Sequence, residues 1–146
     1  MKLNVLRPVY KDFPVSSPFG PRIFRDKQSQ HNGIDFACPV GTPVRSMFDG
    51  RVMKAGWECS PEKQPGQYKE IGYGLRVWQI GIIGDNKYYV WYGHLNEIFA
   101  QEGKLLNVGS LIGYSGNTGR SSGPHLHVGV RKKDTGIFYD MEFYDA

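Results

Sequence analysis

Apolar and polar residues alternate with a period of two along several short stretches of the chain. In residues 34–36 the two apolar side chains share one face and Asp35 occupies the other. In residues 125–130, Leu126 and Val128 likewise point away from the histidines on either side of Leu126. We find no long stretch with apolar residues at helical spacing, so the pattern predicts an all-β fold.

Turn signals separate the predicted strands. Residues 84–86 (Gly-Asp-Asn) lie between two segments rich in β-forming residues, 75–83 and 87–95, and predict a hairpin. The dipeptide Asp49-Gly50 predicts another turn between strands. The order of these signals favours a chain of short strands joined by tight turns.

The remaining segments give weaker signals. Four prolines interrupt residues 1–30, which excludes a sustained helix there and leaves one or two entry strands. Residues 57–73 are polar and contain two prolines, so we expect an exposed loop. Residues 111–114 predict a short strand. We expect a helical turn only over residues 96–103, and that stretch is too short to anchor a fold.

Composition limits the class of protein. A chain of 146 residues with 40% hydrophobic and 22% charged residues can form one folded domain, 1–146, without the help of disulfides. The formal net charge of +4 would attract anions, either nucleic acid or an anionic cell envelope, but a solvated basic surface explains it equally well. Charge alone is thus no reason to expect a nucleic-acid partner, and we expect none. We also expect the chain to be a monomer.

Two cysteines, Cys38 and Cys59, are separated by 21 positions without a CxxC pattern. This spacing does not favour a zinc site made of thiolates. A small buried side chain at Cys38 is the simpler interpretation, and a disulfide between the two cysteines stays open.

Targeting signals are not visible in the sequence. Residues 1–10 include Lys2 and Arg7 but no apolar region of the length that a secretion signal needs, and no run of about 18 apolar residues exists that would predict a membrane span. If the protein acts outside the membrane, we expect it to leave the cytoplasm by cell lysis or as part of a phage particle.

The four histidines carry the strongest chemical signal, together with Asp35. His31 and Asp35 are four residues apart, and glycine between them disfavours a helix, so an extended segment would place both on one face. His125 and His127 would point to the same side of a strand, roughly 6.6 Å apart. That spacing suits one metal ligand and one neighbour that transfers protons.

Zinc in hydrolases generally binds three protein ligands from histidine and acidic residues and keeps a fourth position for water. Two histidines and Asp35 supply such a set. Zinc lowers the pKa of bound water from near 16 to about 7 and polarises the scissile carbonyl. The other histidines could act as base and acid, since the ordinary pKa of histidine lies near neutral pH. From the residues alone, the choice between His125 and His127 as the ligand stays open.

Six motifs occur in a fixed order between about residues 15 and 130. They are Ser17-Pro-Phe-Gly-Pro-Arg22, His31-Asn-Gly-Ile-Asp35-Phe, Gly41-Thr-Pro-Val44, Asp49-Gly50, Tyr92-Gly-His94-Leu and Ser115-Gly-Asn-Thr-Gly-Arg-Ser-Ser-Gly-Pro-His125-Leu-His127. With these motifs the chain resembles the lysostaphin-type (LytM-like) zinc metallopeptidases, a family of peptidoglycan endopeptidases.

The resemblance implies antiparallel β-sheets in a single domain of the LytM-like, duplicated hybrid motif type, with a substrate groove over a zinc site. It implies that His31, Asp35 and His127 bind one Zn²⁺ per chain, and that His94 and His125 form the catalytic pair. Members of this family also carry a tyrosine about six residues before the first ligand, where this chain has Arg25.

These observations lead to a zinc metalloendopeptidase that hydrolyses peptide bonds in the stem peptide or cross-bridge of bacterial peptidoglycan. An endolysin or a tail-associated lysin of a phage would fit the lack of a visible signal peptide. The main alternative is a non-catalytic relative that binds wall peptides or activates another hydrolase. A nucleic-acid binder that uses the basic surface is a third hypothesis, supported only by charge.

Overall fold

The computed structural model describes residues 2–24, 27–58 and 72–145. Within these ranges the protein is built from β-strands and contains no helix. The strands are β1 (Lys2–Leu6), β2 (Val15–Ser17), β3 (Gly20–Phe24), β4 (Lys27–His31), β5 (Ile34–Ala37), β6 (Pro43–Arg45), β7 (Gly50–Trp57), β8 (Leu75–Ile83), β9 (Asn86–Ile98), β10 (Leu105–Leu106), β11 (Leu111–Ser115), β12 (His125–Lys132) and β13 (Asp140–Tyr144). The predicted all-β class is therefore confirmed.

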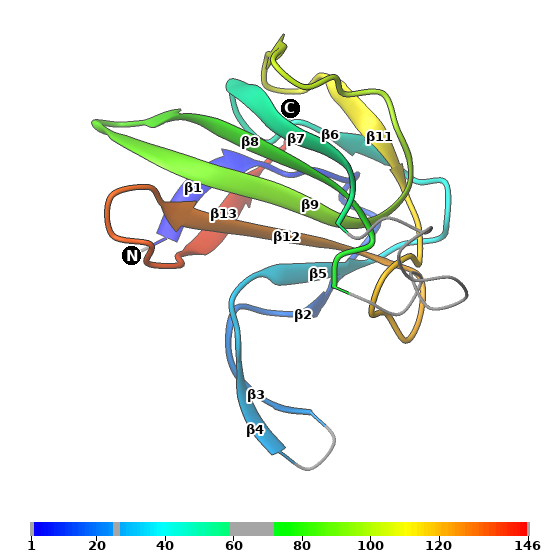
Figure 1. Cartoon of the computed structure of the whole chain (residues 1–146). Helices are drawn as coiled ribbons and strands as arrows, with labels where there is room; N and C mark the ends of the chain where they lie inside the picture. Colours follow the sequence, from blue (N-terminus) through cyan, green and yellow to red (C-terminus); the bar gives the residue numbers. More distant parts are fainter. Residues whose placement is uncertain (1, 25–26, 59–71, 146) are drawn as a thin grey trace.

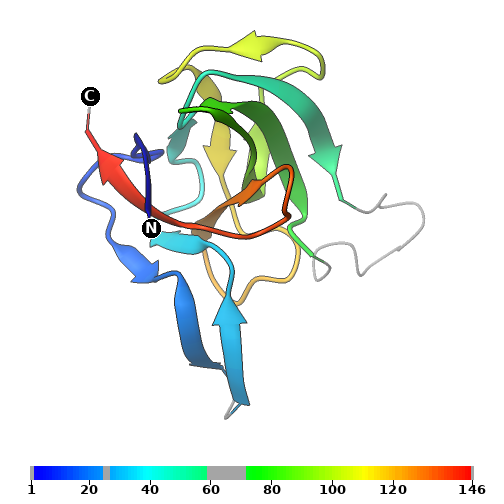
Figure 2. The same cartoon turned by 90° about the vertical axis from the view of Figure 1, so that its left-hand side faces the viewer.

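One large antiparallel sheet organises the described residues. Its strand order is β10-β7-β8-β9-β12-β5-β2, and β11 joins it by pairing with both β6 and β9. The hairpin of β3 and β4 projects from the body beneath β5 and β2, as Figures 1 and 2 show. The strands β1 and β13 form a separate parallel pair, which places the first and last strands of the chain side by side.

The strands follow the sequence predictions closely in the middle of the chain. The predicted hairpin is present as β8 and β9, joined at Gly84-Asp85, and the predicted strand near residue 111 is β11. The predicted helical turn over residues 96–103 is wrong. Strand β9 continues to Ile98 because Glu97 and Ile98 pair with β11, so long-range pairing overrides a weak local helix signal.

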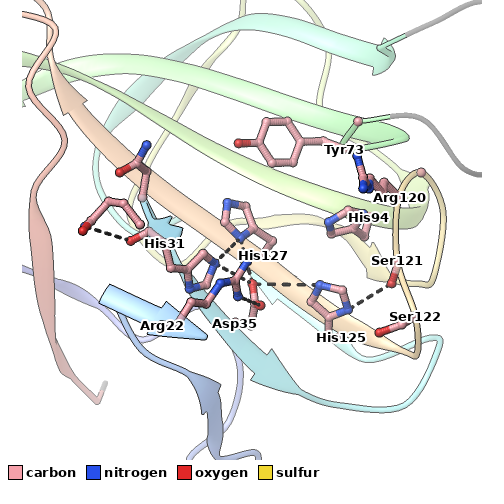
Figure 3. Close-up of a pocket in the computed structure, with 14 residues that line it drawn as sticks. Arg22, His31, Asp35, Tyr73, His94, Arg120, Ser121, Ser122, His125 and His127 are labelled. Atoms are coloured by element: carbon pink, nitrogen blue, oxygen red, sulfur yellow. Dashed lines mark hydrogen bonds and ion pairs between the residues drawn. The ribbon is translucent and has the colours of Figure 1, made fainter. Parts of the chain in front are cut away.

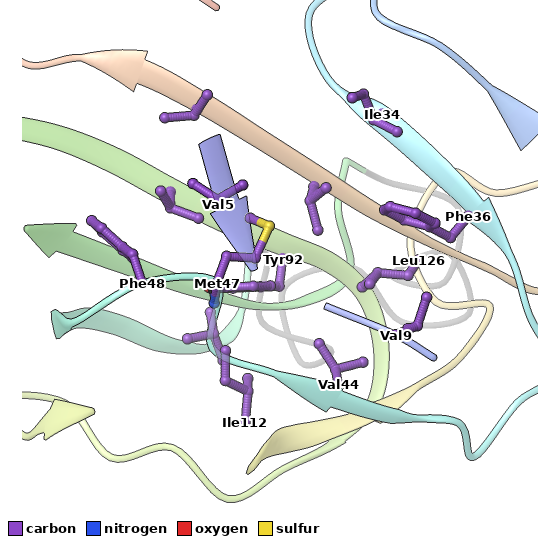
Figure 4. Packing of buried hydrophobic residues seen from close by; sticks show 14 of the residues in the cluster. Val5, Val9, Ile34, Phe36, Val44, Met47, Phe48, Tyr92, Ile112 and Leu126 are labelled. Atoms are coloured by element: carbon purple, nitrogen blue, oxygen red, sulfur yellow. Dashed lines mark hydrogen bonds between the residues drawn. The ribbon is translucent and has the colours of Figure 1, made fainter. Parts of the chain in front are cut away.

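The hydrophobic core lies on the face of β5 and β12 opposite the histidines. Phe36 on β5 and Leu126 on β12 are fully buried, as period-two alternation predicts, and they pack with Val44 and Ile112 (Figure 4). Each large buried aliphatic or aromatic side chain contributes about 1.5–3 kcal/mol to folding. The core therefore fixes the strands whose other face carries the polar side chains.

A polar network sits inside this core. The hydroxyl of Tyr92 donates a hydrogen bond to Gln79 Oε1 at 2.5 Å and accepts one from the backbone N–H of Met47 at 2.9 Å. Gln79 Nε2 in turn donates to Ser46 Oγ at 2.9 Å. Because the side chains of this network satisfy one another, it ties β8 and β9 to the segment before β7 while limiting the cost of burying polar groups.

Some sequence predictions concern residues beyond the described ranges. Most of the predicted loop over 57–73 falls at residues 59–71, and Arg25 and Cys59 also lie outside the described residues.

Cys38 is buried and its thiol contacts the carbonyl of Phe36. The described part of the chain contains no helix long and apolar enough to cross a membrane.

Candidate active site

Three neighbouring strands and the end of β4 bring the predicted site residues together. On the sheet, His127 of β12 pairs with Asp35 of β5 on one side and with Gly93 of β9 on the other. His94 follows Gly93, and His125 lies two residues before His127 on the same face. All five predicted site residues therefore line one open pocket (Figure 3).

The segment between His31 and Asp35 is interrupted, whereas the sequence predicts one extended run. Strand β4 ends at His31 and β5 begins at Ile34, with Asn32 and Gly33 between them. A Cβ atom on Gly33 would collide with the ring of His127 and with the carbonyl of Val128. Glycine is therefore required here so that β4 can cross close to β12 and deliver His31 to the site.

Three ligand-type atoms converge at the centre of the pocket. His127 Nδ1 lies 2.8 Å from Asp35 Oδ1, and His31 Nε2 lies 3.5 Å from the same oxygen and 3.4 Å from His127 Nδ1. All three atoms lie within 4.8 Å of one another. His125 Nε2 is farther from the carboxylate, at 3.9 Å from Asp35 Oδ1.

The donor chemistry of this cluster fits a divalent cation. His31 Nδ1 lies 3.0 Å from the carbonyl oxygen of Pro18, so in a neutral ring Nδ1 carries the hydrogen and Nε2 presents a lone pair. That lone pair faces a carboxylate oxygen, which is also an acceptor. Two imidazole nitrogens and one carboxylate oxygen form the ligand set that zinc binds in hydrolases.

Asp35 is held as a carboxylate. Burial would raise its pKa, but the hydrogen bonds and positive charge that His127 and His31 offer when they are protonated outweigh burial and hold the pKa well below its usual range. Arg22 lies 3.8 Å from Asp35 Oδ2 and donates to Ser17 Oγ at 2.9 Å. Oδ2 therefore has a cationic neighbour while Oδ1 faces the two histidines.

His94 and His125 are oriented by backbone carbonyls. The Nδ1–H of His94 donates to Thr118 O at 2.6 Å, and that of His125 donates to Gly123 O at 2.8 Å. In the neutral form each ring therefore has an unprotonated Nε2. The ring centroids are 4.6 Å apart, so two proton acceptors lie side by side next to the ligand cluster.

The backbone at His94 is strained. Its φ is +62°, a left-handed conformation that residues other than glycine rarely adopt. The N–H of His94 donates to Tyr73 O at 2.6 Å, and Thr118 Oγ1 accepts from Leu75 N at 3.1 Å and donates to Leu95 O at 2.7 Å. These contacts lock the strained residue between β8, β9 and the loop that follows β11.

Comparison with known proteins identifies the family. The sequence profile of peptidase family M23 matches residues 29–138. The chain belongs to peptidase family M23.

Relatives of this M23 chain include two endopeptidases whose names give different specificities. It is 36% identical over 109 residues to the glycyl-glycine endopeptidase ALE-1 of Staphylococcus capitis, a match that covers 75% of this chain and 26% of ALE-1. It is 37% identical over 123 residues to the peptidoglycan DD-endopeptidase ShyA of Vibrio cholerae, which covers 82% of this chain and 25% of ShyA. The chain thus spans about a quarter of the length of these curated relatives.

The fold is also shared with solved M23 structures. The catalytic domain of EnpA, a prophage-encoded M23 protein from Enterococcus faecalis solved as a point mutant, superposes with a TM-score of 0.72 at 28% sequence identity. The match covers 92% of this chain and 93% of that one. The predicted resemblance to the lysostaphin-type family and its antiparallel fold are confirmed.

Tyr73 is a residue of the M23 site that the sequence analysis does not single out. Its ring stacks on that of His127, with centroids 5.1 Å apart and planes 15° apart, and its edge meets His94 at 5.9 Å. A Cβ on Gly93 would press against the Tyr73 ring, so glycine beside His94 makes room for the tyrosine. The flanking glycines, Gly72 and Gly74, both with positive φ, are the local signal for the turn that places it.

Burial keeps His94 neutral in the folded protein. The pKa of His94 is lowered to about 4 from 6.5, mainly by burial and also by the nearby rings of His125 and His127, while the hydrogen bond to Thr118 O acts in the opposite direction. At neutral pH His94 is therefore a base without a bound proton.

This shift predicts that the metal-free protein loses stability in mild acid. The unfolded chain binds a proton at His94 as the pH falls below 6.5, whereas the folded chain does so only near pH 4. The contribution of neutral His94 to the free energy of unfolding is complete above pH 6.5 and falls by about 3 kcal/mol as the pH drops to 4. Urea unfolding with a chelator at several pH values measures it. His94→Asn should reduce this slope by the share that His94 contributes, whereas the part due to His127, whose pKa burial also lowers, should remain. An unchanged slope in that variant would contradict the assignment.

Proposed function

We propose that this chain is a zinc-dependent endopeptidase that hydrolyses peptide bonds of bacterial peptidoglycan. The observation that carries the proposal is the convergence of His31, Asp35 and His127 beside two further histidines in one open pocket. A closed structural metal site would not need that second pair of rings or the open side.

In this proposal one zinc ion per chain is held by His31 Nε2, Asp35 Oδ1 and His127 Nδ1, the three atoms that converge. Bound zinc supplies Lewis-acid polarisation of the scissile carbonyl and lowers the pKa of a water molecule. Asp35 contributes negative charge that offsets part of the charge of the cation. Arg22, close to Asp35 Oδ2, keeps the carboxylate turned so that Oδ1 faces the two rings.

His94 and His125 act as the proton-transfer pair. The unprotonated Nε2 of His94 would take a proton from the attacking water, since burial leaves this ring neutral at pH 7, and would pass it to the amine nitrogen that leaves as the C–N bond breaks. The His125 ring, 4.6 Å away, is placed to stabilise negative charge on the carbonyl oxygen once it has gained a proton. Their backbone hydrogen bonds keep both rings in the orientation that this exchange needs.

The relatives support the class of substrate. ALE-1 is a glycyl-glycine endopeptidase and ShyA a peptidoglycan DD-endopeptidase, so both relatives cleave within peptides, and the name of ShyA gives peptidoglycan as its substrate. The similarity to a prophage-encoded M23 protein is compatible with our expectation of release by lysis or from a phage particle. Finding the chain delivered by its own cleaved secretion signal would contradict that setting.

A non-catalytic role has no observation in its favour. A relative that only binds wall peptides has no use for two further histidines beside the ligand cluster, and here His94 and His125 are both present and oriented. We therefore keep hydrolysis as the function.

Purified peptidoglycan provides the direct test. The protein loaded with zinc is expected to release new amino groups from the walls, a chelator should stop the release, and added zinc should restore it. Metal analysis should give about one zinc per chain. Binding to walls without new amino groups would overturn the proposal, and so would full activity in the chelated protein.

A further inference from the structure

Two arginines line the pocket, and their surroundings differ. Arg22 is half-buried, and its guanidinium is engaged by Ser17 Oγ and by Asp35. Arg120 is exposed and lies on the side of the histidine cluster away from Arg22 in Figure 3. None of the ion pairs found among residues 2–24, 27–58 and 72–145 includes Arg120.

The backbone around Arg120 is firmly placed although the side chain is exposed. Its N–H donates to Gly72 O at 2.8 Å. A Cβ on the preceding Gly119 would collide with the backbone of the turn at Gly72 and Gly74, so the two segments pack tightly. On the other side, Ser121 Oγ donates to Asn117 Oδ1 at 2.6 Å. The guanidinium therefore extends from a fixed point on the pocket wall.

That fixed point is next to the proton-transfer pair. Thr118, two residues before Arg120, accepts the hydrogen bond of His94, and Ser121, the next residue, lies 3.1 Å from His125 Nδ1. A group bound by Arg120 would therefore be held within reach of the bond that these histidines act on.

Among the described residues, the lining of the pocket offers Arg120 no counter-charge. Asp35 is the acidic side chain of that lining, and His31, His127 and Arg22 already surround its carboxylate. The lining residues next to Arg120, Ser121 and Ser122, carry hydroxyl groups only. An anionic ligand would complete this wall.

We propose that Arg120 binds a free carboxylate of the substrate, so that the groove selects acidic wall peptides over neutral oligoglycine. This inference rests on the proposed peptidase function and gives the substrate class of the same site. A guanidinium can bind a carboxylate through two parallel N–H···O bonds, which fixes the peptide as well as attracting it. Removal of the guanidinium should thus affect binding more than the chemical step.

The test compares two forms of one cross-linked stem-peptide dimer, one with free carboxylates and one with every carboxylate amidated, together with pentaglycine. For the free-acid dimer, Arg120→Gln is expected to raise KM by about tenfold or more while kcat stays nearly constant, because a hydrogen bond to a charged group contributes about 1.5–3 kcal/mol. For the amidated dimer, KM should be the same in both proteins. Arg120→Lys should be intermediate, and Lys54→Gln, an exposed charge outside the pocket, should behave as wild type.

The outcomes separate this inference from the proposed function. Faster hydrolysis of pentaglycine than of the acidic dimer by the wild type would overturn the role of Arg120 while preserving the peptidase. So would an equal effect of Arg120→Gln on the free-acid and amidated dimers. If the zinc-loaded wild type hydrolyses none of the three peptides and also fails on intact walls, the proposed function falls and this inference falls with it.

Discussion

His127→Ala is expected to abolish metal binding and wall hydrolysis together. His127 is buried, and its Nδ1 is the atom nearest to Asp35 Oδ1, at 2.8 Å. Without it only two of the three converging atoms remain, and zinc sites in hydrolases use three protein ligands. Loss of the Lewis acid removes several kcal/mol of transition-state stabilisation, so kcat/KM should fall by about 10³-fold or more. Metal analysis of the purified variant and the release of amino groups from peptidoglycan measure both effects.

The neighbouring histidine of the same strand supplies the matched control. His125→Ala also removes one imidazole from the pocket, but His125 Nε2 lies 3.9 Å from Asp35 Oδ1 and is not one of the three converging atoms. This variant should keep about one zinc per chain and still lose activity. If His125→Ala loses the metal while His127→Ala retains it, the assignment of ligand and proton-transfer residue must be exchanged.

Removal of the His94 ring should separate catalysis from metal binding. His94→Asn is the suitable change because asparagine tolerates left-handed backbone, and φ at this residue is +62°. The variant should fold and bind zinc normally, and kcat should fall by about 10²–10⁴-fold, the usual contribution of a general base. KM should change little. Single-turnover hydrolysis of a defined wall peptide, with metal content measured on the same sample, tests this expectation.

Two results would contradict that role of His94. Normal kcat in His94→Asn would show that another group accepts the proton. Loss of zinc in parallel with activity would place His94 among the ligands, although it is not one of the converging atoms. Unfolding in urea at neutral pH provides the control for a general folding defect.

Much of the site could be predicted because its residues lie in short, strongly patterned segments. The alternation around Asp35 and around His127 indicates which side chains point away from the core. In the structure Asp35 and His127 line the pocket, whereas Phe36 and Leu126 lie in the core. Period two is a local property, so a single sequence reveals it. The residues that the resemblance assigns to the metal are the ones whose atoms converge.

The errors have a different origin. Residues 96–103 carry a weak helical signal, and strand β9 instead continues through Glu97 because β11 offers it a partner from far along the chain. The pairing of β1 with β13 is equally non-local, and no local pattern indicates it. Tyr73 falls in a segment predicted as a polar loop, but it reaches His127 because the bare backbone of Gly93 lets it approach. Such contacts depend on the assembled sheet.

Thr118 links two parts of the site, the ring of His94 and the loop that carries Arg120. Its carbonyl fixes the His94 ring, its hydroxyl bridges β8 and β9, and the chain continues from it directly to Arg120. A ligand that displaces this stretch on entering the groove must displace the imidazole as well. In the proposed mechanism, a peptide that displaces this stretch would also misplace the His94 ring, so it would be hydrolysed slowly even when it is held tightly.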